Sequence, residues 1–325
     1  MKGKIWLFIS ILCIAAGLGL MLASGLRSGG DLEDVLSGAG YAEHLTEKTY
    51  DVDESFHSIS VRASSDDVRL LPAEDGRCRV SCGESERCRY RVSVENGTLT
   101  VTREDEGKGH IGISFSGESI PLRIYLPEQS YKALTVDCSS GDVETAAGFR
   151  FDQAQISTSS GEIMLRDFTA KELELSSTSG DISLSRCDLG TLTLDSTSGE
   201  ISLKDTVCTG AAKLRATSGD STLEDSTLGS LDLSCTSGEV NLTRTVCDGA
   251  ARVETTSGEI TLQDAGAKSF ELSANSGDVE GSVRGPVDFI VDSTSGDIHT
   301  SGGVRGAAPC RVSTTSGDVD LEAAD

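Results

Sequence analysis

The sequence predicts an all-β fold, a single-chain parallel β-helix (β-solenoid) of about ten two-strand coils, with an N-terminal transmembrane helix. The first observation is a tripeptide, Ser-Gly-(Asp or Glu), that returns every 19 to 21 residues and is almost always followed by an aliphatic residue. A period of this size is typical of solenoids and repeat arrays. The glycines of the series are Gly141, Gly161, Gly180, Gly199, Gly219, Gly238, Gly258, Gly277, Gly296 and Gly317.

The second observation is a strand-like alternation of apolar residues inside each unit. Leu192 and Leu194 lie two apart before one tripeptide, and Ile201 and Leu203 lie two apart after it, which is the period of a β-strand. We therefore expect two strands per unit and a turn at each tripeptide, where Gly permits positive φ and the polar side chains can bond the local backbone. A second turn is expected at Gly190, Gly210, Gly229 and Gly249.

Stacked parallel coils are favoured over a long meander of hairpins. In consecutive coils, equivalent residues lie above one another at about 4.8 Å and form ladders, so ten coils would make a rod of roughly 45 to 50 Å. One predicted ladder is Thr178, Thr197, Thr217, Thr236 and Thr256. A small inward residue is expected three positions before each Gly: Cys138, Thr158, Ser177, Ser196, Ala216, Cys235, Thr255, Ala274, Ser293 and Thr314.

Residues 1–27 carry a membrane-directed segment. Lys2 and Lys4 precede an uncharged 19-residue run from Ile5 to Ala23, and Arg27 follows it. This run is close to the length that spans a bilayer, so we expect an uncleaved anchor, with a cleaved signal peptide as the alternative. The two lysines favour a cytoplasmic N-terminus. The prediction is a single-pass protein of the cell membrane whose C-terminal domain is extracytoplasmic.

Two regions separate this anchor from the repeats, which occupy residues 136–325. Residues 28–49 have Ser, Gly and acidic character with little periodicity, and we expect a stalk or linker. Residues 50–135 are expected to form a β module, because alternating apolar residues surround Asn96-Gly97, the dipeptide that best suits a two-residue hairpin turn. Ser65-Asp66-Asp67-Val68 resembles the repeat with Asp in place of Gly. The module is therefore interpreted as a degenerate solenoid end that caps the first coil.

The chain has ten cysteines, which an extracytoplasmic location would allow to pair. Cys208 and Cys247 are predicted to lie two coils apart in one column, about 10 Å and too far for a disulfide. Cys78, Cys82 and Cys88 leave a disulfide or a metal site open, although their spacing matches no zinc pattern. Four cysteines are expected to be small buried side chains: Cys138, Cys208, Cys235 and Cys247.

The acid that follows each repeat glycine is the main candidate for a functional site. Like charges stacked about 5 Å apart repel one another and attract cations, and Ca²⁺ prefers oxygen ligands. We name these residues the acid ladder and predict a cation site there, with solvated turn carboxylates as the alternative. Its members are Asp142, Glu162, Asp181, Glu200, Asp220, Glu239, Glu259, Asp278, Asp297 and Asp318.

Composition argues against several classes of function. The formal net charge of −24 disfavours nucleic acid as a partner. A β-helix polysaccharide-active enzyme is the catalytic alternative, but no Phe, Tyr or Trp occurs from Thr169 to Ser269, and sugar sites usually need aromatic platforms and convergent carboxylates. We expect no enzyme, no catalytic residues and no cofactor other than Ca²⁺.

These features resemble the bacterial putative-adhesin β-strand-repeat family, a domain of unknown function with Ser-Gly-Asp repeats, often behind a single transmembrane helix. The resemblance covers about residues 50–325 and rests on the tripeptide series, on the strand Leu122, Ile124, Leu126 closing at Pro127, and on the distance from Pro127 to Gly141. It implies an envelope-facing β-solenoid, in some relatives linked to envelope stress responses. We therefore expect an adhesin-like binding or scaffolding surface whose partner is an envelope protein, a peptide or a glycan.

The last predicted coil is followed by only four residues, Glu322 to Asp325, and so has no visible cap. Unpaired N–H and C=O groups beside Val319 and Leu321 would invite strand addition from a partner or from a second copy of the chain. We predict self-association or partner capture at this edge. In the alternative interpretation, the acidic side chains around this edge would prevent strand addition by their charge.

Overall fold

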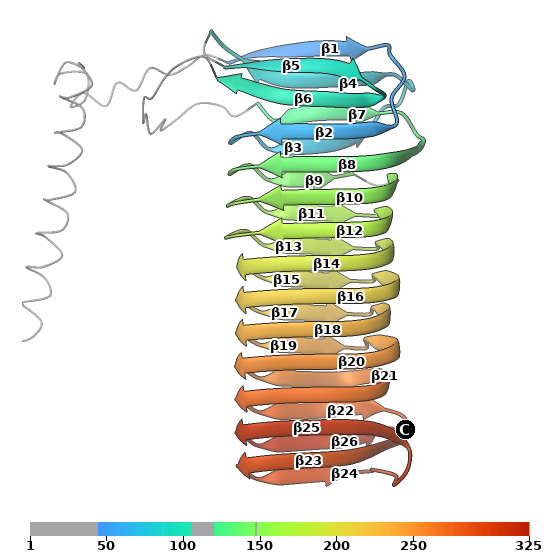
Figure 1. Cartoon of the computed structure of the whole chain (residues 1–325), viewed down its shortest axis with the longest axis vertical. Coiled ribbons are helices and arrows are strands. Elements are labelled where there is room, and N and C mark those ends of the chain that lie inside the picture. The colour runs from blue at the N-terminus through green and yellow to red at the C-terminus, as the bar shows by residue number, and fades with distance from the viewer. Residues whose placement is uncertain (1–44, 87, 106–119, 147, 325) are drawn as a thin grey trace, which may run out of the picture.

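The computed structural model describes residues 45–86, 88–105, 120–146 and 148–324. Every regular element within these ranges is a β-strand, and the strands stack into one straight rod (Figure 1). The apolar run predicted to be the anchor lies outside the described residues. Within the described ones, no helix long and apolar enough to cross a membrane is found.

The rod is made of two facing sheets, which we call the first and second sheets. From the N-terminal end, the first sheet contains β1 (Thr46–Val52), β4 (Cys78–Glu84), β7 (Leu122–Leu126), β3 (Val68–Pro72), β9 (Val143–Thr145), β11 (Ile163–Arg166), β13 (Ile182–Ser185), β15 (Ile201–Lys204), β17 (Ser221–Glu224), β19 (Val240–Thr243), the start of β21 (Ile260–Ser276), β22 (Val279–Arg284), β26 (Val319–Ala324) and β24 (Ile298–Ser301).

The strands of the second sheet are longer, and they are named here from the N-terminal end of the rod as well. It contains β5 (Cys88–Glu95), β6 (Thr98–Asp105), β2 (Ser58–Ala63), β8 (Ser130–Cys138), β10 (Arg150–Thr158), β12 (Thr169–Ser177), β14 (Asp188–Ser198), β16 (Val207–Ser218), β18 (Thr227–Ser237), β20 (Val246–Ser257), the end of β21, β25 (Ala308–Ser316) and β23 (Val287–Ser295).

Each repeat forms one coil, with a long strand in the second sheet and a short strand in the first. Neighbouring coils pair in parallel, and equivalent residues stack: Leu175 pairs with Leu194, and Ile182 pairs with Ile201. The predicted inward leucines and isoleucines are buried. Nine of the ten small residues three before each Gly are buried as well, the exception being Ser293 in the outermost coil. The predicted all-β solenoid of about ten turns is confirmed.

The glycines at the tripeptide corners are explained mainly by the neighbouring coil. A Cβ atom on Gly180 would lie 1.9 Å from the carbonyl oxygen of Gly161, and the same clash recurs along the column. Positive φ, the predicted reason, holds for only some members, such as Gly219 at 118°. Close stacking of one backbone on the next therefore excludes a side chain at this corner.

The second turn predicted at Gly190, Gly210, Gly229 and Gly249 is wrong. These glycines lie inside the long strands, where the register between neighbouring strands shifts by one residue. The chain instead turns after each short strand, at non-glycine residues in the left-handed conformation: Asp167, Arg186, Asp205, Asp225, Arg244 and Asp264, with φ from 47° to 56°. A bulge rather than a turn accounts for the glycines.

The side chains that fill the second corner become smaller beyond the N-terminal repeats. The rings of Phe56, Tyr131, Phe151 and Phe168 stack in sequence with centroid separations of 5.9, 5.4 and 5.3 Å. Beyond Phe168, the inward position at the second corner is held by Cys187, Thr206, Ser226, Thr245 and Ala265, all buried. The core is a narrow strip that continues along the whole rod.

The N-terminal module extends the solenoid. Strands β2 and β3 form a coil that pairs in parallel with β8 and β9, and Asp66 occupies the position of the repeat glycine, against Gly141. The predicted hairpin at Asn96-Gly97 is confirmed, since β5 and β6 pair antiparallel around it. Strands β1, β4 and β5 lie antiparallel at the end of the rod. Strand β1 begins at Thr46, inside the segment interpreted as stalk.

The predicted C-terminal edge at Val319 and Leu321 is wrong. Strand β26, which contains both residues, pairs with β22 on one side and with β24 on the other. Both side chains are fully buried. The chain runs past this position, forms the outermost coil with β23 and β24, and then returns to fill the gap, as the position of the C-terminus in Figure 1 shows. The open edge belongs to β23 and β24.

Candidate interaction surface

The tripeptide corner carries three parallel columns of polar side chains along the rod. Two are hydroxyl columns, in which the predicted threonine ladder is exposed at every rung. The third is the acid ladder, whose members are exposed except for the half-buried Asp142, Glu162 and Glu259. The structure therefore brings the predicted acids into one line on the surface.

The aspartates of the acid ladder also have a structural role. Oδ1 of Asp181 accepts a hydrogen bond from the backbone N–H of Glu200 at 2.7 Å, and Oδ1 of Asp220 accepts one from Glu239 at 2.8 Å. The same contact joins further rungs, including Asp142 to Glu162. A short carboxylate thus satisfies an N–H of the next coil at a point where the ladder of strand bonds is interrupted.

Burial and like charges act on part of this ladder. Burial raises the pKa of Glu162, and the neighbouring carboxylates Asp142 and Asp181 raise it further. A hydrogen bond to Glu259 raises the pKa of Glu280, with added repulsion from the same group. These shifts show that the carboxylates are close enough to repel one another.

Repulsion alone does not make a metal site. Among the residues that the structure describes, no group of three or more His, Cys, Asp or Glu side chains converges on a point that could hold an ion. The Oδ1 atoms that bond the backbone are also partly occupied. The cation site therefore stays a prediction.

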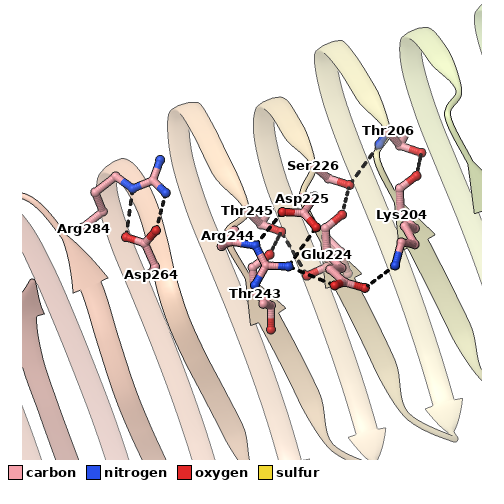
Figure 2. Close-up of polar contacts among 11 residues, drawn as sticks. Lys204, Thr206, Glu224, Asp225, Ser226, Thr243, Arg244, Thr245, Asp264 and Arg284 are labelled. Atoms are coloured by element: carbon pink, nitrogen blue, oxygen red, sulfur yellow. Dashed lines mark hydrogen bonds and ion pairs between the residues drawn. The ribbon is translucent and has the colours of Figure 1, made fainter.

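A second charged ladder lies at the other corner, and the sequence interpretation missed it. Arg186 donates two hydrogen bonds to the Asp167 carboxylate, at 2.8 and 2.7 Å. Arg244 contacts both oxygens of Asp225, at 2.6 and 2.8 Å, and also Glu224 at 2.9 Å. Figure 2 shows the contacts of Arg244 with Asp225 and Glu224, together with the pair between Arg284 and Asp264.

These arginines hold the acids of the second corner ionised. Hydrogen bonds from Arg186, Arg244 and Arg284 lower the pKa of Asp167, Asp225 and Asp264 respectively. The signal was present in the sequence, because an Asp or an Arg recurs at the repeat period in this column. The second corner is consequently close to neutral, whereas the acid ladder concentrates negative charge on the opposite corner.

Buried hydroxyls lie beneath the charged corner. Oγ1 of Thr245 donates a hydrogen bond to the carbonyl of Leu223 at 3.0 Å, and Oγ1 of Thr206 donates to that of Lys204 at 3.1 Å. Oγ of Ser226 accepts a hydrogen bond from the N–H of Thr206 at 3.2 Å (Figure 2). These contacts satisfy the hydrogen-bonding capacity of backbone groups at a turn that contains no glycine.

Two hollows on the described surface are shallow. One, of about 290 Å³, lies over the N-terminal repeats beside Phe151, Lys171 and Asp188. The other, of about 330 Å³, lies on the second sheet near its C-terminal end, between Arg252 and Ile290. Neither brings paired carboxylates or a nucleophile and base into a defined catalytic arrangement.

A buried polar network ties the N-terminal strands to the first coil. Asp66 accepts hydrogen bonds from the hydroxyl of Tyr90, at 2.5 Å, and from Arg103. Burial raises the pKa of Glu84, but hydrogen bonds from Tyr50, the Tyr90 backbone and Lys48 outweigh it and leave the pKa lowered. With every charge partnered, the network is structural.

All nine cysteines in the described part of the chain are buried. Cys208 and Cys247 lie two coils apart with Leu228 between them, as predicted. Burial raises the pKa of the Cys78 and Cys82 thiols to about 12, which makes them poor nucleophiles and poor metal ligands. The small buried role predicted for the repeat cysteines is confirmed.

Comparison with known proteins shows which family the repeat region matches. Residues 56–322 match the model of the family described as Toastrack DUF4097. Among solved structures, a "putative lipid binding protein" from Parabacteroides distasonis is 14% identical, with a TM-score of 0.41, over 86% of this chain and 97% of that one. A "putative adhesin" from Bacteroides fragilis is 12% identical, with a TM-score of 0.37, over 86% and 97%. No curated protein matches the chain.

Proposed function

This chain belongs to the Toastrack DUF4097 family, and we propose that it is a single-pass membrane protein whose extracytoplasmic β-solenoid presents an adhesin-like binding or scaffolding surface at the cell envelope. A role in envelope stress is part of this proposal. The partner would be an envelope protein, a peptide or a glycan.

The observation that carries the proposal is the repetitive tripeptide corner. Hydroxyl and carboxylate columns repeat at every coil, about 4.8 Å apart, so an extended partner could make the same contact many times. Weak contacts repeated along one ligand add up to useful affinity without a deep pocket. The two hollows are shallow and lie on the surface of the rod, which suits contact with an extended partner.

The membrane part of the proposal rests on the sequence. Lys2 and Lys4, the uncharged run that follows, and the strongly acidic remainder suit an N-terminus inside the cell and a rod outside it. The test is fractionation with protease shaving of intact cells. We expect a membrane-bound chain whose rod is cleaved from outside. A soluble mature form beginning near Arg27 would overturn the anchor.

The binding surface is tested with cross-linking pull-downs of the full chain on intact cells. In one variant, three neighbouring rungs of the acid ladder are neutralised by Asp181→Asn, Glu200→Gln and Asp220→Asn, because Asn keeps an oxygen that can accept the backbone hydrogen bond. In the control variant, the same charge change is made outside the ladder: Asp232→Asn, Asp248→Asn and Glu271→Gln.

We expect the ladder variant to lose its cross-linked partner and the control variant to keep it. Equal capture by both variants would show that this corner is not the binding surface. The enzymatic alternative makes a different prediction, because a single neutralised carboxylate should then abolish an activity, whereas a multivalent surface loses affinity gradually.

A further inference from the structure

The C-terminal end of the rod exposes the apolar core. Four large apolar side chains are exposed in the described part of the chain, and three of them lie in the outermost coil: Ile290, Ile298 and Val304, at 48%, 50% and 51%. Ile290 pairs with the exposed Arg311 and so lies on the outer face of β23, whereas Ile298 faces the core. Ile298 stands in the column of Val319, which is 1% exposed one coil further in. Ile298 is therefore a core residue that lacks only the next coil.

The backbone at this end is also without a partner strand. Among the strands that the structure describes, β24 pairs only with β26, and β23 only with β25. The N–H of Val319 donates to the carbonyl of Asp297. Because backbone groups alternate sides along a strand, those of Ile298 and Thr300 point away from the rod. Two parallel rows of unused N–H and C=O groups thus flank an open apolar strip.

The opposite end of the rod presents polar side chains. There β1, β4 and β5 lie antiparallel across the rod, and the outer strand β1 presents exposed polar residues, Thr46 to Thr49. None of the exposed large apolar side chains found in the described ranges lies at this end. A head-to-tail contact would therefore press an apolar end against a polar one.

We propose that the C-terminal end is the docking face for a second copy of this chain, so that two rods meet end to end through β23 and β24. A two-fold axis perpendicular to the rod places an antiparallel strand of the partner against each open edge, which allows both edges to pair at once. It also brings the two apolar strips into contact, so the interface is self-complementary.

The area available fits a weak dimer. Strand β23 has nine residues, about 30 Å, and two sheet layers that are each about 10 Å thick give an end face about 20 Å wide, or roughly 600 Å². Two such faces bury about 1,200 Å², the lower end of the range for specific interfaces. We expect a dissociation constant on the order of micromolar. The inference rests on the fold alone, and combined with the proposed anchor it would join two facing envelopes.

The test is sedimentation equilibrium of the full-length chain in a mild detergent. Ile298→Lys should weaken the dimer about tenfold or more, since it places a charge in the apolar contact. Thr300→Pro removes an outward N–H from an edge strand, where Pro is tolerated. It should weaken the dimer to a similar extent. The control is Val207→Lys, because Val207 is 43% exposed in the middle of the rod. It should leave the dimer intact.

Two further readouts distinguish this dimer from others. Added salt should tighten it, because each copy carries a net charge of −24 and salt screens the repulsion between the two rods. A spin label at Thr300→Cys should report a short distance between copies, whereas one at Thr49→Cys, about 60 Å away along each rod, should report none. A wild-type chain that stays monomeric at about 100 μM, well above the expected constant, or a dimer unaffected by Ile298→Lys, would overturn the proposal.

Discussion

At each tripeptide corner, the glycine is required by the coil beneath it. Gly161 is buried at such a corner, and a Cβ atom there would lie 1.9 Å from the carbonyl oxygen of Gly141. No rotamer change can relieve a clash with backbone. The column of glycines therefore sets how closely the coils stack at this corner, and a glycine with a coil packed against its Cβ position cannot be replaced by other turn-forming residues.

Gly180→Ala and Gly76→Ala separate the two reasons for a glycine. Gly180 is blocked by a neighbouring carbonyl, whereas Gly76 has positive φ and nothing within 4 Å of its Cβ position. We expect Gly180→Ala to cost about 3 kcal/mol or more by overpacking, and Gly76→Ala only about 1 kcal/mol by backbone strain. Urea unfolding measures both. Equal costs would contradict the stacking explanation.

Glu162 should make the fold more stable in mild acid. Because burial and its acidic neighbours raise its pKa in the folded state, the folded protein binds this proton more tightly than the unfolded chain. Unfolding free energy therefore rises as the pH falls from neutral toward the ordinary Glu value of 4.5. The paired Asp167 has the opposite shift, and its contribution is lost only below the ordinary value of 3.8.

The measurement is the urea midpoint at neutral pH and at about pH 5, for the wild type and for Glu162→Gln. The substitution removes the titrating group, so the gain in mild acid should shrink. A gain of the same size in the variant would assign the effect to other carboxylates.

At the scale of one element, the turn after each short strand is stabilised more by its buried hydroxyl than by its ion pairs. The Arg244 guanidinium and the Asp225 carboxylate lie on the surface, where water and salt weaken their attraction. The Thr245 hydroxyl lies beneath them, is buried and bonds two carbonyls. A buried carbonyl that loses its donor keeps the cost of desolvation.

Thr245→Val should therefore destabilise the protein more than Arg244→Ala. We expect about 1 to 2 kcal/mol for Thr245→Val, because the shape is kept while the hydrogen bonds are lost, and almost no change in the urea midpoint for Arg244→Ala. High salt should leave the first effect unchanged. A larger loss from Arg244→Ala would mean that the charged ladder determines the turn.

For the whole molecule, the unequal corners predict how it responds to ions. One corner pairs its charges, whereas the acid ladder carries carboxylates about 5 Å apart along the rod. If the ladder binds cations, millimolar Ca²⁺ should raise the melting temperature of the full chain beyond that in NaCl of matched ionic strength. Asp181→Asn with Glu200→Gln should reduce the difference. Equal melting temperatures in both salts would leave the ladder as solvated turn carboxylates.

The sequence by itself determined the coil. Parallel stacking, the inward columns and the line of acids were all predicted from the spacing of the ten glycines and from the alternation around residues such as Leu192 and Ile201. This was possible because, in a solenoid, residues one repeat period apart lie above one another. The sequence even located Asp66 as the substitute for a repeat glycine. The charged corner was equally periodic, but its turn residues are not glycines and were overlooked.

Only the tertiary structure decided which coil is last. Val319 and Leu321 end the sequence repeat, yet β26 is inserted between β22 and β24, so the exposed core belongs to Ile298. Each repeat looks alike in sequence, and the pattern that buries a strand does not specify the neighbour it pairs with. The order of strands at the ends depends on how the chain crosses in space. That order, and not the repeat, determines which residues face a partner.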